Sequence, residues 1–229
     1  MNRIFLTGDT HGEIDIKKLT SKCFPEGNQL DKNDYVIILG DFGFIWNNVP
    51  DKQEAYWMKW FMDKPWTTLF IDGNHSNFQR LQAFEVTQWN GGNVHIINDS
   101  VIHLMRGQIF YIAGRTIFTF GGAESYDKAQ RTAYISWWPE EIPSYKEMNE
   151  GIDNVQKIDK VDYILTHTAP YDLVTKTMGY TDCTDPTAKM LNWYMQNVNF
   201  KHWFFGHWHL DKDYGSKFSA LYNSIVEVK

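Results

Sequence analysis

Five short polar blocks, each placed directly after an apolar run, constrain the fold of this chain more than any other feature. In chain order the blocks are Asp9-x-His11, Gly40-Asp41, Gly73-Asn74-His75, Thr166-His167 and Gly206-His207-x-His209. The runs before them are short and rich in β-branched and aromatic residues, as in YVIILGD and HWFFGHWH, which is typical of buried strands. Open α/β sheets place their functional groups at the ends of successive strands. We therefore expect the five blocks to converge at one sheet edge.

The order of the remaining segments indicates an α/β fold with two sheets packed face to face and helices outside. The expected strands are 3–8, 34–39, 67–72, 94–98, 101–106, 109–113, 116–120, 162–166 and 202–206, with final strands near 217–228. The expected helices are 15–22, 51–63, a short one after Ser76, 127–135, 144–158 and 185–197. Helical connections between the first three strands predict a mostly parallel arrangement there. The strands between 94 and 120 follow turns too short for crossover helices, so we expect them to be antiparallel.

Bulk properties restrict the class of protein. At 229 residues, with no repeat or linker, the chain is expected to form a single domain over 1–229. A formal charge of −6 offers no global attraction for nucleic acid or an anionic membrane. No apolar run approaches the roughly 18 residues of a membrane span, and the first residues lack a signal-peptide pattern. Cys23 and Cys183 show no metal or redox spacing, so a cytoplasmic location without membrane partners is the simplest expectation.

The residue types in the blocks favour two divalent transition metals. Because side chains alternate along a strand, the spacing of Asp9 with His11 predicts that both face one site, and the same holds for His207 with His209. Carboxylate and imidazole ligands suit Mn, Fe, Zn, Co or Ni better than Ca or Mg. Asp41 is the natural bridge, because one carboxylate can give an oxygen to each metal.

Such a site is suited to phosphoester hydrolysis. Two metals about 3.5–4 Å apart generate a hydroxide near neutral pH and stabilise the displaced oxygens. Two divalent ions outweigh the charges of Asp9 and Asp41 together with a bridging hydroxide, so the site would still attract a phosphate anion.

Together the blocks resemble the calcineurin-like metallophosphoesterase superfamily, whose pattern is D-x-H, G-D, G-N-H-[DE], a lone His and G-H-x-H. The resemblance spans residues 9–209 and implies a four-layer α-β-β-α sandwich of two mixed sheets flanked by helices. Manganese is the first expectation for both metals, and the resemblance implies that one of them is held by Asp9, His11, Asp41 and His209. It implies that a second metal is held by Asp41, Asn74, His167 and His207. His75 would be an unligated catalytic histidine that contacts phosphate and protonates or electrostatically stabilises the leaving group.

Two departures from the family pattern bear on activity. The second block continues as Phe42-Gly43-Phe44 and lacks the G-D-x-x-D-R-G of the serine/threonine phosphoprotein phosphatase branch. In the family a carboxylate often follows the third block, where it could orient the histidine. This chain has Ser76 at that position, directly after His75. A protein phosphatase remains an alternative that the first departure disfavours. A catalytically silent scaffold is a second alternative, which the retention of every ligand and of His75 disfavours.

The segment 127–143 is the candidate for substrate selection. Arg131 can contact a phosphate bidentately, and Trp137 and Trp138 can stack on a base or ring. The alternative interpretation is a hydrophobic flap packed on the second sheet. We expect the substrate to be a phosphomonoester or phosphodiester, and the tryptophan pair suggests a nucleotide or a nucleic-acid end.

Overall fold

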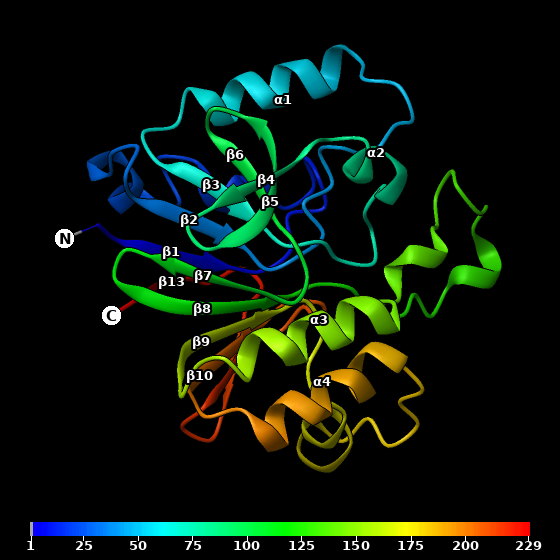
Figure 1. Cartoon of the computed structure of the whole chain (residues 1–229). Coiled ribbons are helices and arrows are strands. Elements are labelled where there is room, and N and C mark those ends of the chain that lie inside the picture. Colours follow the sequence, from blue (N-terminus) through cyan, green and yellow to red (C-terminus); the bar gives the residue numbers. More distant parts are fainter. Residues whose placement is uncertain (1) are drawn as a thin grey trace.

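The computed structural model describes residues 2–229, which form two mixed β-sheets between layers of helices (Figure 1). The first sheet has the strand order β13-β1-β2-β3-β6-β5-β4, and the second has the order β11-β12-β10-β9-β8-β7. Helix α1 covers the outer face of the first sheet, and α3 and α4 cover the second (Figure 1). This arrangement confirms the expected α-β-β-α sandwich.

The element bounds are as follows. The strands of the first sheet are β1 (Ile4–Thr7), β2 (Tyr35–Ile38), β3 (Thr67–Phe70), β4 (Val86–Trp89), β5 (Gly92–Asn98), β6 (Val101–Leu104) and β13 (Ile225–Val228). Those of the second are β7 (Gln108–Ile112), β8 (Arg115–Phe120), β9 (Val161–Thr166), β10 (Phe200–Phe205), β11 (Lys212–Tyr214) and β12 (Phe218–Ala220). The α-helices are α1 (Lys52–Met62), α2 (Phe78–Gln82), α3 (Tyr145–Val155) and α4 (Pro186–Asn197). A π-helix spans Leu173–Met178, and 3-10 turns span Ile16–Leu19, Pro25–Gln29, Lys128–Gln130 and Pro139–Glu141.

Side-chain alternation in the central strands divides the core into layers. In β1, Leu6 packs in the cluster between the two sheets, whereas Phe5 packs in the cluster beneath α1. In β2, Ile37 and Val36 divide in the same way. Both faces of these strands are buried, so their sequences are continuous apolar runs, as parallel sheets require.

Helices α1 and α3 begin where the sequence predicts because side chains cap their first turns. Asp51 Oδ1 accepts a hydrogen bond from the Glu54 N–H at 2.8 Å, and Ser144 with Glu147 forms a reciprocal capping box. Such caps satisfy N–H groups that have no partner inside the helix. The helices expected at 51–63, 144–158 and 185–197 are confirmed, with small shifts at their ends.

Two other expected helices are wrong. Residues 15–22 contain only the short 3-10 turn Ile16–Leu19, and residues 127–135 contain only the turn Lys128–Gln130. In the second segment Tyr134 adopts a left-handed backbone with φ 61°, and Ile135 is 62% exposed. A short helix needs an apolar face packed on the core, and this segment has none.

The expected run of antiparallel strands from 94 to 120 is only partly correct. Strand β5 pairs antiparallel with β6, and β7 pairs antiparallel with β8, but β6 and β7 belong to different sheets. The short link 105–107 therefore carries the chain from one sheet to the other. Strands β4 and β11 were not predicted, whereas the final strands expected near 217–228 are confirmed as β12 and β13.

The strand register aligns the strand ends that the polar blocks follow. Thr7 of β1 pairs with Ile38 of β2, which pairs with Phe70 of β3, and in the second sheet Thr166 pairs with Phe205. These strand ends lie on the side of α2 and the segment 127–143, away from both termini (Figure 1). Among residues 2–229, no helix combines the length and apolarity needed to cross a membrane.

A buried ion pair fixes the link between the sheets. Arg106 lies in that link, and its Nη2 and Nε donate to Asp72 Oδ2 at 2.6 and 2.8 Å. Arg106 Nη2 also donates to the carbonyl of Glu140 at 2.9 Å. Burial raises the pKa of Asp72, but the charges of Arg106 and His103 outweigh it and lower that pKa to about 2.

We expect Arg106→Leu to lower the free energy of unfolding by about 3–5 kcal/mol, because it removes the main counter-charge of the buried Asp72 carboxylate. The matched control is Arg3→Leu, which removes the surface pair with Glu227 and should cost less than about 1 kcal/mol. Urea denaturation at pH 7 measures both values. Equal losses in the two variants would contradict the role given to Arg106.

Candidate metal centre

The structure brings all seven predicted ligand residues together beyond the ends of the central strands of both sheets. Ligand atoms of Asp9, His11 and His209 lie within 4.8 Å of one another, and so do those of Asp9, Asp41 and His167. Asn74 Oδ1 lies 2.9 Å from His167 Nε2 and 3.1 Å from His207 Nδ1. The five sequence blocks therefore form one polar cluster, which we call the candidate metal centre.

Asp41 occupies the middle of this cluster. Its Oδ2 lies 3.4 Å from His11 Nε2 and 3.5 Å from His167 Nε2. Its Oδ1 accepts a hydrogen bond from the His75 backbone N–H at 2.7 Å. The carboxylate thus stands between the two groups of side chains that the sequence assigns to separate metals.

The expected cause of the ligand spacing, alternation along a strand, is wrong. Strand β1 ends at Thr7, and His11 lies beyond it with φ 44°. His207 and His209 likewise have φ values of 64° and 48°, and Asp41 has 44°. Left-handed backbone is uncommon for residues other than glycine, and such strain is concentrated at functional sites. Local left-handed turns, rather than strand alternation, aim these side chains.

Glycines in the blocks leave room for the ligand side chains. A Cβ on Gly40 would lie 2.0 Å from His167 Nδ1, and one on Gly73 would lie 2.1 Å from Asp41 Oδ1. No side chain fits at either position without displacing a candidate ligand. The glycines of the G-D and G-N-H blocks are therefore part of the geometry of the site.

Hydrogen bonds orient two of the imidazoles. His167 Nδ1 donates to the Leu39 carbonyl at 2.8 Å, which turns Nε2 toward Asp41 and Asn74. His11 Nδ1 lies 2.8 Å from Asp15 Oδ2, which leaves its Nε2 toward Asp41. Contacts of this kind fix the ring and tautomer of metal-binding histidines.

The two carboxylates are compensated by neighbouring imidazoles. Burial alone raises the pKa of Asp41, but the charge of His167 and a hydrogen bond from His11 lower it well below its usual value. Burial lowers the pKa of His167 and His11, and the attraction of Asp41 and Asp9 outweighs it, so both are raised to about 9. Burial and the charge of His167 lower the pKa of His207 to about 3.

These residues fit divalent cations. Asp9 Oδ2 is buried and accepts no hydrogen bond of good geometry from residues 2–229, although His209 Nε2 is 3.2 Å away. A buried carboxylate oxygen in this condition is costly unless a cation or donor faces it. Metal ions would supply the positive charge that protonated His11 and His167 otherwise carry, because imidazole ligands bind metals in their neutral form.

His75 lies beside this cluster at half-buried depth. Its ring centre is 5.9 Å from that of His11 and 6.4 Å from that of Trp46. Burial, with the charge of Arg131, lowers its pKa despite the attraction of Asp41. Ser76, which replaces the family carboxylate, accepts a hydrogen bond from the Gly73 N–H at 3.1 Å and so holds the turn.

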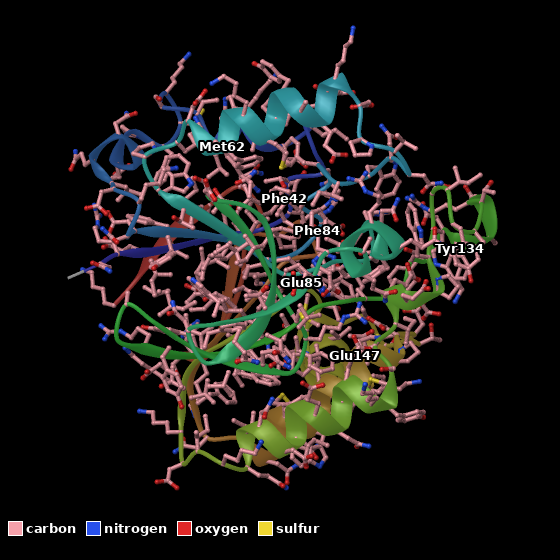
Figure 2. The ribbon with its side chains drawn as sticks, turned by 45° about the horizontal axis from the view of Figure 1, so that its top comes forward. Phe42, Met62, Phe84, Glu85, Tyr134 and Glu147 are labelled. Atoms are coloured by element: carbon pink, nitrogen blue, oxygen red, sulfur yellow. The ribbon has the colours of Figure 1, made fainter. Side chains whose placement is uncertain are left out.

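The three residues predicted to select substrate lie in different environments in the structure. Trp138 is fully buried with its ring edge-on to Trp46 at 5.1 Å, so the stacking role expected for it is replaced by packing. Trp137 is half-buried, and the Arg131 guanidinium is paired with Asp127 at 2.7 Å. Figure 2 shows Tyr134 at the outer end of this segment, where it is exposed.

Two residues that sequence reasoning missed hold Asn74 in place. Asn74 Nδ2 donates to Ser125 Oγ at 3.0 Å, and Ser125 Oγ donates to Glu141 Oε2 at 2.6 Å. Glu141 is fully buried and also accepts from the Ser125 N–H at 2.9 Å. The chain of hydrogen bonds turns Asn74 Oδ1 toward His167 and His207. Ser125 and Glu141 stand outside the five blocks, so no local motif marks them.

Comparison with known proteins agrees with this geometry. A family model described as calcineurin-like phosphoesterase matches residues 2–211. The chain belongs to the calcineurin-like phosphoesterase family. A search of curated proteins returned no match. Family membership and the cluster of Asp and His side chains together support a metal-dependent hydrolase that acts on phosphoesters.

We expect Ser125→Ala to weaken Mn²⁺ binding roughly 10- to 100-fold, the scale for loss of a residue that orients a metal ligand. Ser136→Ala is the matched control, because the Ser136 hydroxyl contacts only the Thr132 backbone within residues 2–229. Calorimetric titration of metal-free protein measures both. Unchanged affinity in Ser125→Ala would show that Asn74 does not depend on this contact.

Proposed function

We propose that the protein hydrolyses phosphoesters with two divalent transition metals bound at the candidate metal centre. The observation that carries this proposal is the position of Asp41 between two sets of ligand side chains. One set comprises Asp9, His11 and His209. The other comprises Asn74, His167 and His207.

The bound metals would supply a nucleophile near neutral pH and stabilise charge on the phosphate oxygens. The protein residues fix where this happens. Asp41 Oδ2 faces both His11 and His167 and would serve both metals, while its Oδ1 holds the His75 backbone through a hydrogen bond. The same carboxylate therefore positions both the ligand shell and the catalytic histidine.

His75 would act on the phosphate rather than on a metal. Because burial lowers its pKa, a neutral ring that donates an N–H hydrogen bond to a phosphate or leaving-group oxygen suits this position. Manganese is the first metal to test, and both monoesters and diesters are candidate substrates. The direct test is turnover of p-nitrophenyl phosphate and bis-p-nitrophenyl phosphate by metal-free protein, with and without Mn²⁺. We expect turnover only with metal. Absence of turnover of both esters in the presence of Mn²⁺ would overturn the proposal in favour of a catalytically silent scaffold.

The two roles can be separated by mutation. We expect Asp41→Asn to lose metal, because it removes charge from the residue shared by both sets of ligands. We expect His75→Ala to keep its metal and to lower kcat at least about a hundredfold, the scale for losing one hydrogen-bond donor to the transition state. Metal content by elemental analysis and steady-state kinetics measure the two effects.

Loss of metal from His75→Ala would also be informative. The ligand atoms of His75, His11 and Asp41 lie within 4.8 Å of one another, close enough for the three residues to hold one metal ion. If His75→Ala loses metal as completely as Asp41→Asn, His75 is a ligand and its proposed role is wrong. Hydrolysis by His75→Ala at the wild-type rate would show that His75 takes no part in catalysis.

A further inference from the structure

A cavity of about 500 Å³ opens beside the candidate metal centre. Its walls are formed by residues 11–14, residues 43–47 and the first turns of α1, with Arg131 at one side. His11 and His75 line both the cavity and the candidate metal centre. The volume lies within the roughly 300–1,000 Å³ range of small-molecule sites. A phosphoester held at the metals would therefore extend its organic group into this space.

Part of the cavity lining is aromatic and aliphatic. Trp46 and Trp57 are half-buried, and Trp57 packs on Phe44 at a ring distance of 5.2 Å. Ile14 stands on the rim with 73% of its side chain exposed, only three residues after His11. Rings held from behind, with free surface toward a cavity, are suited to stacking on a planar group.

Other lining residues present hydrogen-bond acceptors. Glu13 accepts a hydrogen bond from the Gln53 amide at 2.7 Å, which leaves the Gln53 carbonyl and the second Glu13 oxygen for a ligand. Asp51 caps α1, and Glu54 is paired with Arg80 at 2.7 Å. Besides His11, which faces the carboxylate of Asp41, the cation among the described residues that line the cavity is Arg131, and Asp127 already neutralises it.

This distribution of charge selects among ligands. Carboxylates repel a second phosphate, so a polyphosphate or the backbone of a nucleic-acid strand would be unfavourable in the cavity. A neutral planar ring with amino groups would stack on the lining tryptophans and donate hydrogen bonds to the lining acceptors.

We propose that the cavity binds the amine-bearing base of a mononucleotide-sized phosphoester while its phosphate lies at the candidate metal centre. This inference rests on the proposed function. It narrows the substrate to a small nucleotide and assigns base recognition to Trp46, Ile14 and Gln53, in place of Trp138.

The experiment compares substrates that differ only in the group placed in the cavity. Adenosine 5′-monophosphate and ribose 5-phosphate serve if monoesters are cleaved. The p-nitrophenyl esters of adenosine 5′-monophosphate and of ribose 5-phosphate serve if diesters are cleaved. We expect kcat/KM to favour the base-bearing compound by roughly five- to a hundredfold, the scale of one stacked base.

Variants locate that preference on the protein. Trp46→Ala should abolish most of it, and Ile14→Ser should reduce it several-fold, with turnover of the base-free compound near wild type in Ile14→Ser. Val49→Ser is the control, because Val49 is also 73% exposed but lies outside the cavity. Replacing adenine by purine, which lacks only the amino group, should lower kcat/KM roughly two- to tenfold if the amino group donates to the lining acceptors.

Failure of this inference is distinguishable from failure of the proposed function. Metal-dependent turnover with no preference for the base-bearing compound, or a preference that Trp46→Ala and Ile14→Ser leave unchanged, overturns the inference and leaves phosphoester hydrolysis intact. Absence of any metal-dependent turnover overturns the proposed function instead. In that event, calorimetry with adenosine 5′-monophosphate and ribose 5-phosphate still decides whether the cavity binds the base, because only base-specific binding that Trp46→Ala removes would support it.

Discussion

Two carboxylates with almost no exposure to solvent, Asp9 and Asp41, set the electrostatics of the candidate metal centre. Burying a charge is costly unless an opposite charge faces it, and here protonated His11 and His167 do so at ring-to-carboxylate distances of 3.4 and 3.5 Å from Asp41. The surrounding structure can be understood as the scaffold that holds these charges together. Strands from two sheets end at one level, and the residues that follow them converge.

Assembling this site also costs free energy through backbone strain and missing side chains. Left-handed turns at His11, His207 and His209 direct the rings inward, and the space beside each carboxylate is kept open by glycine. A Cβ on Gly206 would lie 2.3 Å from Asp9 Oδ1, just as one on Gly73 would meet Asp41. The strain and the missing side chains reduce local stability. The surrounding apolar layers, and buried contacts such as Arg106 with Asp72, offset that loss.

Much of the fold and the convergence of the ligand residues could be predicted, because both depend on local signals. Apolar runs mark β1, β2 and β3, and the block after each strand marks its end. The features that could not be predicted depend on distant contacts. The transfer of the chain between sheets relies on Arg106 meeting Asp72, 34 residues earlier. The support of Asn74 by Ser125 crosses 51 residues. Residues 127–135 have helix-forming composition but no core to pack on.

The central claim is that Asp41 bridges two metal ions. The most direct measurement is anomalous diffraction from crystals of the Mn²⁺-reconstituted protein. We predict two manganese peaks about 3.5–4 Å apart, one on each side of the Asp41 carboxylate, with His11 and His209 on one ion and His167 and His207 on the other. A single peak, peaks that do not share Asp41, or no peak at saturating Mn²⁺ would contradict the account.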